Sequence, residues 1–323
     1  MSTAQSATPD VAVIVPTMRR PEALARALHS VFSQQDVAER LREIVVVDND
    51  PRATARDAVA DLTNTSPVPL IYRHEPRPGV ATARNAALSE TQAPLIAFLD
   101  DDEAASPTWL SALLAAQVET GADVVFGPIQ GRVPSGLGWK TAYLERFFGR
   151  QGPEATGLID QAYGCGNSLM VRATALPGPA PFDAASDQSG GEDDALFSAL
   201  EQRGGRFGWA SDAWVEEFAP SHRASLRYAL SRAFAYGQSP PQIAWRERKP
   251  VRVGYWMVVG AAQTIVWGVA SLALALLASP RRAETLDRAA RGLGKLFWIQ
   301  GLEPRFYGAK ELARLERISQ SAA

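Results

Sequence analysis

The sequence predicts an α/β fold with a mostly parallel central sheet flanked by helices, followed by an apolar helical region that associates with a membrane. The first observation is that short, uninterrupted apolar runs alternate with segments whose apolar residues recur at helical spacing. This alternation is typical of parallel sheets with right-handed crossovers. The second is an uncharged stretch over residues 253–279. We therefore expect an α/β domain over residues 1–235 and a basic, apolar helical tail over residues 236–323.

The composition is that of a globular protein. The 323 residues are 46% hydrophobic and 21% charged, which provides a packed core without a bias to disorder. Cys165 is the one cysteine in the sequence, so an internal disulfide is excluded and a reducing compartment is favoured. Residues 1–10 are polar, and we expect no secretory signal there.

Six apolar runs are short enough to be buried strands. They cover residues 11–15, 43–47, 70–72, 95–99, 123–127 and 169–171. Helical spacing predicts helices between them, over residues 23–31, 53–62 and 80–90, from residue 107 onward, and over 195–202. The less regular segment 136–158 places four aromatic residues at the spacing of one helical face: Trp139, Tyr143, Phe147 and Phe148. No Gly-x-Gly-x-x-Gly follows the first strand, so a dinucleotide-binding unit is not expected.

Carboxylates follow two of these strands. The acidic run 100–103 comes directly after strand 95–99, and Asp48 ends strand 43–47. Open α/β sheets bind ligands outside the carboxyl ends of their strands. Adjacent carboxylates repel one another, and a hard cation such as Mg²⁺ or Mn²⁺, held together with substrate phosphates, relieves that repulsion. The alternative is a solvated acidic loop, but convergence of two strands favours a nucleotide–metal site.

The tail differs from the rest of the chain in charge. Up to Pro220 there are 17 basic and 29 acidic residues, a net charge of −12, whereas from Ser221 there are 16 basic and 6 acidic residues, a net charge of +10. With its apolar stretch, this tail favours an anionic lipid surface over nucleic acid.

The apolar stretch is long enough to cross a bilayer. A single crossing would leave the basic end of the chain outside, against the positive-inside tendency. We therefore expect a re-entrant or in-plane membrane helix, or a hairpin with residues 293–302 as its second arm. A buried helix of a soluble protein is the alternative.

Taken in order, the motifs resemble those of the inverting family 2 glycosyltransferases of the GT-A fold, over residues 11–224. They are Pro16-Thr17 with Arg19-Arg20, Asp48-Asn49-Asp50, Gly79 with Arg84-Asn85, Asp100-Asp101-Asp102-Glu103, and Gly190-Gly191-Glu192-Asp193. Five motifs in register are specific, although each alone is weak.

The resemblance implies a role for each motif. The residues that it assigns to binding a nucleotide-sugar donor are Pro16, Thr17, Arg19, Asp48, Arg84, Asn85, Asp100 and Glu192. Within this set, Asp48 would bind the base, Arg84 would lie near the phosphates and Asp100 would face the ribose. Asp102, with Asp100, would hold Mg²⁺ or Mn²⁺. Asp193 would be the general base, and helix capping is its alternative role.

One position departs from the family pattern. Close relatives have a histidine after Val215 that can join the metal site, whereas this chain has Glu216. The departure puts the third metal ligand in doubt rather than the activity, because a carboxylate also suits these cations.

The resemblance implies a metal-dependent inverting hexosyltransferase on the cytoplasmic face of the cell membrane. It would move a sugar, expected to be glucose from a UDP-sugar, to a lipid-linked saccharide in exopolysaccharide or other surface-glycan synthesis, with a β-linkage. One alternative is a sugar nucleotidyltransferase, which usually needs a glycine-rich, basic loop after the first strand. The other is a non-catalytic membrane scaffold, which would not need Asp193.

Overall fold

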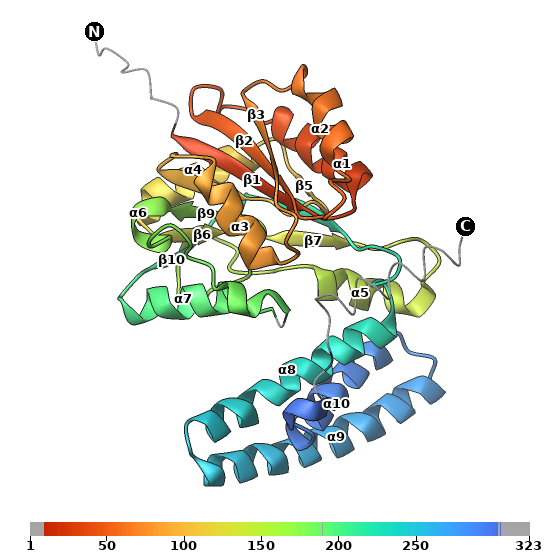
Figure 1. Ribbon diagram of the computed structural model, residues 1–323. Helices are drawn as coiled ribbons and strands as arrows, with labels where there is room; N and C mark the ends of the chain where they lie inside the picture. Colours follow the sequence, from red (N-terminus) through yellow and green to blue (C-terminus); the bar gives the residue numbers. More distant parts are fainter. Residues whose placement is uncertain (1–9, 189, 303, 305–323) are drawn as a thin grey trace. The chain divides into compact units, whose positions relative to one another are not determined.

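The computed structural model describes residues 10–188, 190–302 and 304. These residues divide into two compact units (Figure 1). Unit 1 comprises residues 10–130 and 150–217, and unit 2 comprises residues 131–149 and 218–304, apart from the undescribed positions.

Unit 1 is built on an eight-stranded sheet of order β3-β2-β1-β4-β9-β6-β10-β8. Its strands are β1 Val11–Thr17, β2 Leu41–Asp48, β3 Leu70–His74, β4 Leu95–Phe98, β6 Val124–Phe126, β8 Gly157–Ile159, β9 Ser168–Val171 and β10 Phe207–Trp209. The first four run parallel, β9 is antiparallel to both of its neighbours, and β8 is antiparallel to β10. The predicted α/β class is confirmed, with the six expected strands present and β8 and β10 in addition.

Helices cover both faces of this sheet. Alternate residues of β1 enter two separate cores: Val11, Val13 and Val15 enter one, and Ala12 and Ile14 the other. The first core is closed by α1 Pro21–Phe32, α2 Arg56–Thr63 and α4 Trp109–Thr120, and the second by α3 Val80–Ser89, α6 Arg172–Ala175 and α7 Glu192–Gln202. Burial on both faces explains why the strands read as continuous apolar runs.

A second, smaller sheet has the order β5-β11-β7. Its strands are β5 Glu103–Ala105, β11 Val215–Phe218 and β7 Ile129–Arg132. The antiparallel pairing of β11 with β5 sets Glu217 opposite Glu103. The acidic run therefore continues into a strand instead of a solvated loop.

Unit 2 is helical. It contains η1 Gly138–Lys140, α5 Thr141–Phe148, α8 Leu226–Arg246, α9 Pro250–Leu276, α10 Arg282–Leu296 and η3 Gln300–Leu302. Of the four aromatic residues predicted to share one face, Trp139, Tyr143 and Phe147 join one small core, whereas Phe148 is not part of it. The long helices α8, α9 and α10 pack on one another (Figure 1). Within the described residues, α9 is the one helix that is long and apolar enough to cross a membrane.

Candidate active site

The carboxyl ends of β2, β1 and β4 lie side by side in the sheet. Thr17 at the end of β1 pairs with Asp48 at the end of β2, and Ile14 pairs with Phe98 at the end of β4. Asp100, Asp101 and Asp102 follow β4 directly. The sheet thus brings the two groups of carboxylates to one edge, as the sequence predicts.

Asp101, to which the sequence assigns no role, fastens the β1–α1 loop. Its Oδ2 accepts hydrogen bonds from Thr17 Oγ1 at 2.8 Å and from the Met18 amide at 3.3 Å, and its Oδ1 accepts one from Arg20 Nη1 at 2.9 Å. Burial raises the pKa of Asp101, and the Arg20 charge opposes that shift. The carboxylate is therefore a structural tie between β1 and β4.

Arg20 is a site residue that the sequence reasoning did not select. Besides Asp101, its Nη1 donates to Asp102 Oδ2 at 2.7 Å. Burial acts against the Arg20 cation, but the charges of Asp101 and Asp102 outweigh it and raise the pKa of Arg20. One guanidinium thus neutralises two adjacent carboxylates. The signal available in the sequence was an Arg three residues after the Thr that ends the first strand.

Asp100 is more open than its neighbours. Its side chain is 40% exposed, against 15% for Asp102. A Cβ added to Gly166 would lie 2.7 Å from Asp100 Oδ2, so a larger residue at that position would displace the Asp100 carboxylate. Behind Asp100, its amide donates to Glu103 Oε2 at 2.9 Å.

A cluster of charged side chains, centred on the buried Glu103, supports the carboxylate edge of the sheet. Glu103 is 1% exposed, and burial together with the charges of Asp100 and Glu217 raises its pKa well above the ordinary value. Arg150 opposes that shift and donates to the Gly164 carbonyl at 3.0 Å. This cluster fixes the 164–168 turn against Asp100.

Arg84 on α3 links Asp100, in the acidic run after β4, to the start of α7. Its Nη1 donates to Glu192 Oε1 at 2.5 Å, and its Nη2 lies 3.9 Å from Asp100 Oδ1. The guanidinium sits 5.9 Å from the Phe98 ring centroid and 5.5 Å from that of Phe182. Its Nε is buried and has no hydrogen-bond partner among the described residues. An unused donor on a buried cation suits an anionic ligand.

Asp193 lies in the first turn of α7, after Gly191, whose φ of +89° makes the sharp turn predicted there. Its Oδ2 accepts a hydrogen bond from the Cys165 amide at 3.3 Å, and its Oδ1 one from the Asp194 amide at 2.9 Å. A carboxylate has about four lone-pair sites. The two amides therefore orient Asp193 and leave it capacity to accept a proton.

Helix α3 anchors the segment that leads to Asp193. Asn85 Nδ2 donates to the Phe182 carbonyl at 2.7 Å, and the Phe182 amide donates to Asn85 Oδ1 at 3.1 Å. Asp187, in η2 Ala184–Gln188, accepts from the Ala81 amide at 2.8 Å and from Thr82 Oγ1 at 2.6 Å. The amide of Asn85, predicted to bind the donor, thus holds the main chain of this segment.

Asp48, which is predicted to bind the nucleotide base, is fully buried. Its Oδ1 accepts from the Asp50 amide at 3.0 Å, and its Oδ2 accepts from the Ala55 amide at 2.8 Å and from Tyr72 Oη at 3.0 Å. Asp50 accepts from Arg19 Nε at 3.1 Å, while its other oxygen is buried, has no hydrogen-bond partner among the described residues and lies 3.8 Å from Arg52 Nε. Asp48 and Arg19 are therefore engaged within the fold, beside the partly buried Pro16 and the buried Thr17.

The residues at this edge fit a divalent cation. The described residues contain no group of three or more His, Cys, Asp and Glu side chains placed to hold a metal. Mg²⁺, however, usually takes one or two carboxylates and completes its shell with water and substrate phosphates. Asp100 and Asp102 are the two carboxylates at this edge that would supply those oxygens. Glu216, at the position of the family histidine, lies in β11, opposite Ala104.

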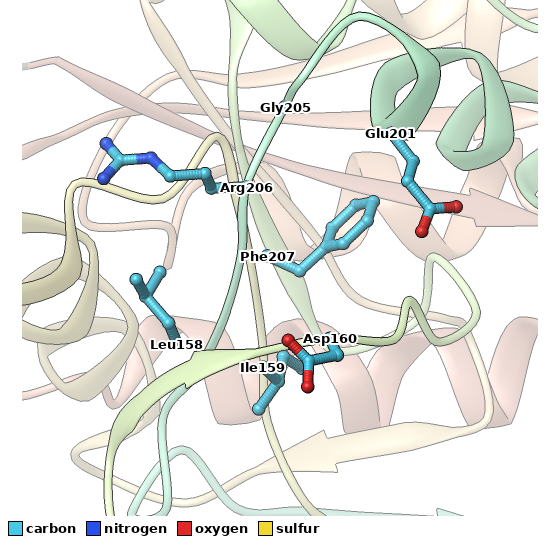
Figure 2. Close-up of a pocket in the computed structure, with 7 residues that line it drawn as sticks. All are labelled: Leu158, Ile159, Asp160, Glu201, Gly205, Arg206 and Phe207. Atoms are coloured by element: carbon cyan, nitrogen blue, oxygen red, sulfur yellow. The ribbon is translucent and has the colours of Figure 1, made fainter.

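A separate cavity of about 310 Å³ lies elsewhere in unit 1 (Figure 2). Its lining comes from β8, the end of α7 and the start of β10: Leu158, Ile159, Asp160, Glu201, Gly205, Arg206 and Phe207. It contains none of the predicted site residues.

This fold and this carboxylate edge are those of a glycosyltransferase. The chain belongs to glycosyl transferase family 2, whose model matches residues 12–176. The succinoglycan biosynthesis protein ExoM of Rhizobium meliloti is 32% identical over 299 residues, which are 92% of this chain and 95% of that protein. The pre-mycofactocin glycosyltransferase of Mycobacterium tuberculosis is 25% identical over 86% of this chain and 58% of its own length.

Solved structures show the same fold at low identity. TarS 1–349 of S. aureus, in complex with UDP, has a TM-score of 0.52 and 16% identity over 93% of this chain and 94% of that chain. The mannosyltransferase PcManGT of Pyrobaculum calidifontis, in complex with GDP-Man and Mn²⁺, has a TM-score of 0.61 and 18% identity over 92% and 89%. The predicted GT-A type of fold is confirmed.

Proposed function

We propose that this glycosyltransferase is an inverting, divalent-cation-dependent hexosyltransferase that extends a lipid-linked saccharide. The observation that carries the proposal is Arg84, whose guanidinium lies 3.9 Å from Asp100 and 2.5 Å from Glu192. Arg84 thereby brings Asp100 close to the first turn of α7, which contains Asp193. A direct displacement requires the donor site and the general base to be held close together in the correct orientation.

The donor is a nucleoside diphosphate sugar, with UDP-glucose as the first candidate. Asp100 would contact the ribose, and Pro16 and Thr17 would border the base near Asp48. Arg84, with its unused buried Nε, would face the diphosphate. Asp102 and Asp100 would hold Mg²⁺ or Mn²⁺, which supplies Lewis-acid neutralisation of the departing diphosphate. The complexes of TarS with UDP and of PcManGT with GDP-Man and Mn²⁺ support such a donor.

Asp193 would act as the general base. Its carboxylate takes the proton of an acceptor hydroxyl, whose oxygen forms a bond to the anomeric carbon as the bond to the diphosphate oxygen breaks. The diphosphate leaves with the electron pair of that bond. Because attack comes from the opposite side, an α-linked donor gives a β-glycoside.

The proposed acceptor is a lipid-linked saccharide of exopolysaccharide or other surface-glycan synthesis, at the cytoplasmic face of the membrane. ExoM supports the pathway class, because the similarity covers nearly all of both chains. The apolar helix α9 supports the location.

Transfer is tested with the purified full chain, Mn²⁺, membranes and a panel of labelled nucleotide sugars. We expect label in the lipid fraction and release of a nucleoside diphosphate, with a β-linkage by NMR. Release of pyrophosphate would instead identify a nucleotidyltransferase. Failure of every donor to label lipid, with thermally stable protein, would contradict the proposal.

A further inference from the structure

The exposed face of α9 is apolar along its whole length. Residues on this face recur every three or four positions, and their exposed fractions include 87% for Val251, 66% for Ile265, 69% for Leu272 and 89% for Leu276. In the most apolar 18 residues of α9, 11% are buried. A core helix of a soluble protein would bury this face, so it is free to meet an apolar medium.

The packed face of α9 is small and polar instead. Thr264 Oγ1 donates to the Gly260 carbonyl at 2.8 Å, and Ser271 Oγ donates to Thr285 Oγ1 of α10 at 2.8 Å. A Cβ on Gly292 would lie 2.7 Å from Thr264 Oγ1, so α10 approaches closely. Polar groups inside and apolar groups outside reverse the pattern of a water-soluble bundle and match helices that face lipid.

Charged residues of α10 lie beside the middle of α9. The Arg288 guanidinium is 4.3 Å from the ring centroid of Trp267, and Arg291 Nε donates to Asp287 at 2.8 Å. If α9 crossed a bilayer, these groups would lie at the depth of the hydrocarbon, where charged side chains are costly. Length and apolarity alone permit a crossing, but the position of α10 opposes it.

The ends of α9 carry the groups that bind a membrane surface. Trp245, in the last turn of α8, and Tyr255, near the start of α9, are 60% and 59% exposed. Basic residues flank both ends: Arg246, Arg248, Lys249 and Arg252 on one side, and Arg281 and Arg282 on the other. Over residues 131–149 and 218–302 the sequence has 15 basic and 4 acidic residues. Exposed aromatics and excess positive charge complement an anionic lipid interface.

We propose that α9 lies in the plane of an anionic bilayer, with the face of Val251, Ile265, Leu272 and Leu276 in the acyl region, and does not cross it. This deepens the membrane association of the proposed function and rests on that association, but not on the chemistry. Unit 2 is then a monotopic anchor. It concentrates the chain on the surface where a lipid-linked acceptor is presented.

Vesicle flotation tests the lipid partner. The full chain should float with vesicles of phosphatidylcholine and phosphatidylglycerol, and weakly with phosphatidylcholine alone. The double variant Val269→Glu/Leu272→Glu should lower partitioning roughly tenfold or more, because it places charges in the apolar face. The control Val118→Glu/Leu158→Glu changes two exposed apolar residues of unit 1 and should float like the wild type. Equal loss in both variants, or no flotation of the wild type, would overturn the proposal.

Cysteine labelling distinguishes lying in the plane from crossing. In a Cys165→Ala background, single cysteines replace Lys249 or Arg281, the exposed basic residues that flank the two ends of the apolar face, or Val266 near its middle. Sealed inverted membrane vesicles that carry the full chain are treated with an impermeant maleimide. An in-plane helix gives reaction at both ends and protection at position 266. Protection of one end until detergent is added would show a crossing and overturn the proposal. Neither flotation nor cysteine labelling depends on turnover. Failure of this membrane proposal can therefore be distinguished from failure of the proposed reaction.

Discussion

Asn85 and the main chain of Phe182 form a closed pair of hydrogen bonds across 97 residues of sequence. The side-chain amide donates to the Phe182 carbonyl at 2.7 Å and accepts from the Phe182 amide at 3.1 Å. Both polar groups of the amide are engaged, so the Asn85 side chain satisfies the main-chain donor and the main-chain acceptor of Phe182. The segment from Phe182 leads into Gly191 and Asp193, and Asn85 therefore acts as a positioning residue for the proposed base.

Replacing Asn85 by Ala should lower kcat more than it changes donor affinity. The variant leaves a carbonyl and an amide of Phe182 without their partners and loosens the segment that precedes Asp193. A misplaced base loses part of the 10²–10⁴-fold contribution of general base catalysis, so we expect kcat to fall roughly tenfold or more. Steady-state kinetics and calorimetric titration of the donor measure the two quantities.

The control is Ser89→Ala, at the exposed end of the same helix, where the hydroxyl donates to the Ala86 carbonyl. It should leave kcat and donor affinity unchanged. If Asn85→Ala instead weakened donor binding with kcat intact, Asn85 would contact the donor directly, as the family resemblance implies.

Asp193→Asn should abolish turnover while donor binding survives. The amide preserves the shape of the side chain and can still accept from the Cys165 amide, but it cannot take a proton. We expect kcat to fall by about 10²–10⁴-fold at constant donor affinity. Asp194→Asn removes the same charge one residue later, and it should retain most activity. Comparable losses in both variants would assign the effect to the charge of the helix terminus.

Arg20→Gln should destabilise the protein and make it more responsive to Mn²⁺. Asp101 is 6% exposed and would lose its charged partner, at a cost of about 1–3 kcal/mol. With two carboxylates less neutralised, Mn²⁺ should raise the melting temperature more in the variant than in the wild type, as calorimetry can measure.

Arg42→Gln is the matched control, because Arg42 is 46% exposed and lies 3.7 Å from Glu43 on the surface. Such surface pairs contribute about 0–1 kcal/mol. Equal Mn²⁺ shifts in the wild type and in Arg20→Gln would contradict the idea that Arg20 and a cation neutralise the same carboxylates.

The central strands were predictable because their physical signal is local. Residues 11–15 and 44–47 are apolar on both faces, and each face enters a different core. The strands that the sequence did not reveal are short and have no such pattern: β10 is Phe-Gly-Trp, and β7 contains Gln and Arg. Their extended form depends on pairing with neighbours that are distant in sequence.

For the site, topology was predictable and side-chain partners were not. The sheet order places Asp48 and Asp102 at one edge, which the strand pattern alone implies. By contrast, the hydrogen bonds from Arg20 to Asp102 and from Asn85 to Phe182 join residues 82 and 97 apart. Those contacts depend on loop conformations that no periodicity encodes. This is why no sequence pattern reveals the role of Asp101 or the contact of Asn85 with Phe182.

Replacing Asp101 and Asp102 individually by Asn should have two different effects. In the wild type, transfer should stop after treatment with EDTA and return when Mn²⁺ is added. In Asp102→Asn the Mn²⁺ concentration that gives the half-maximal rate should rise roughly tenfold or more, because a charged oxygen ligand is lost. Asp101→Asn removes an equal charge from a carboxylate that holds Thr17 and Arg20. It should lower the melting temperature and leave the Mn²⁺ requirement close to that of the wild type. Titrating Mn²⁺ against rate in both variants, with thermal unfolding alongside, gives both quantities. An increased Mn²⁺ requirement in Asp101→Asn alone would reverse the two assignments.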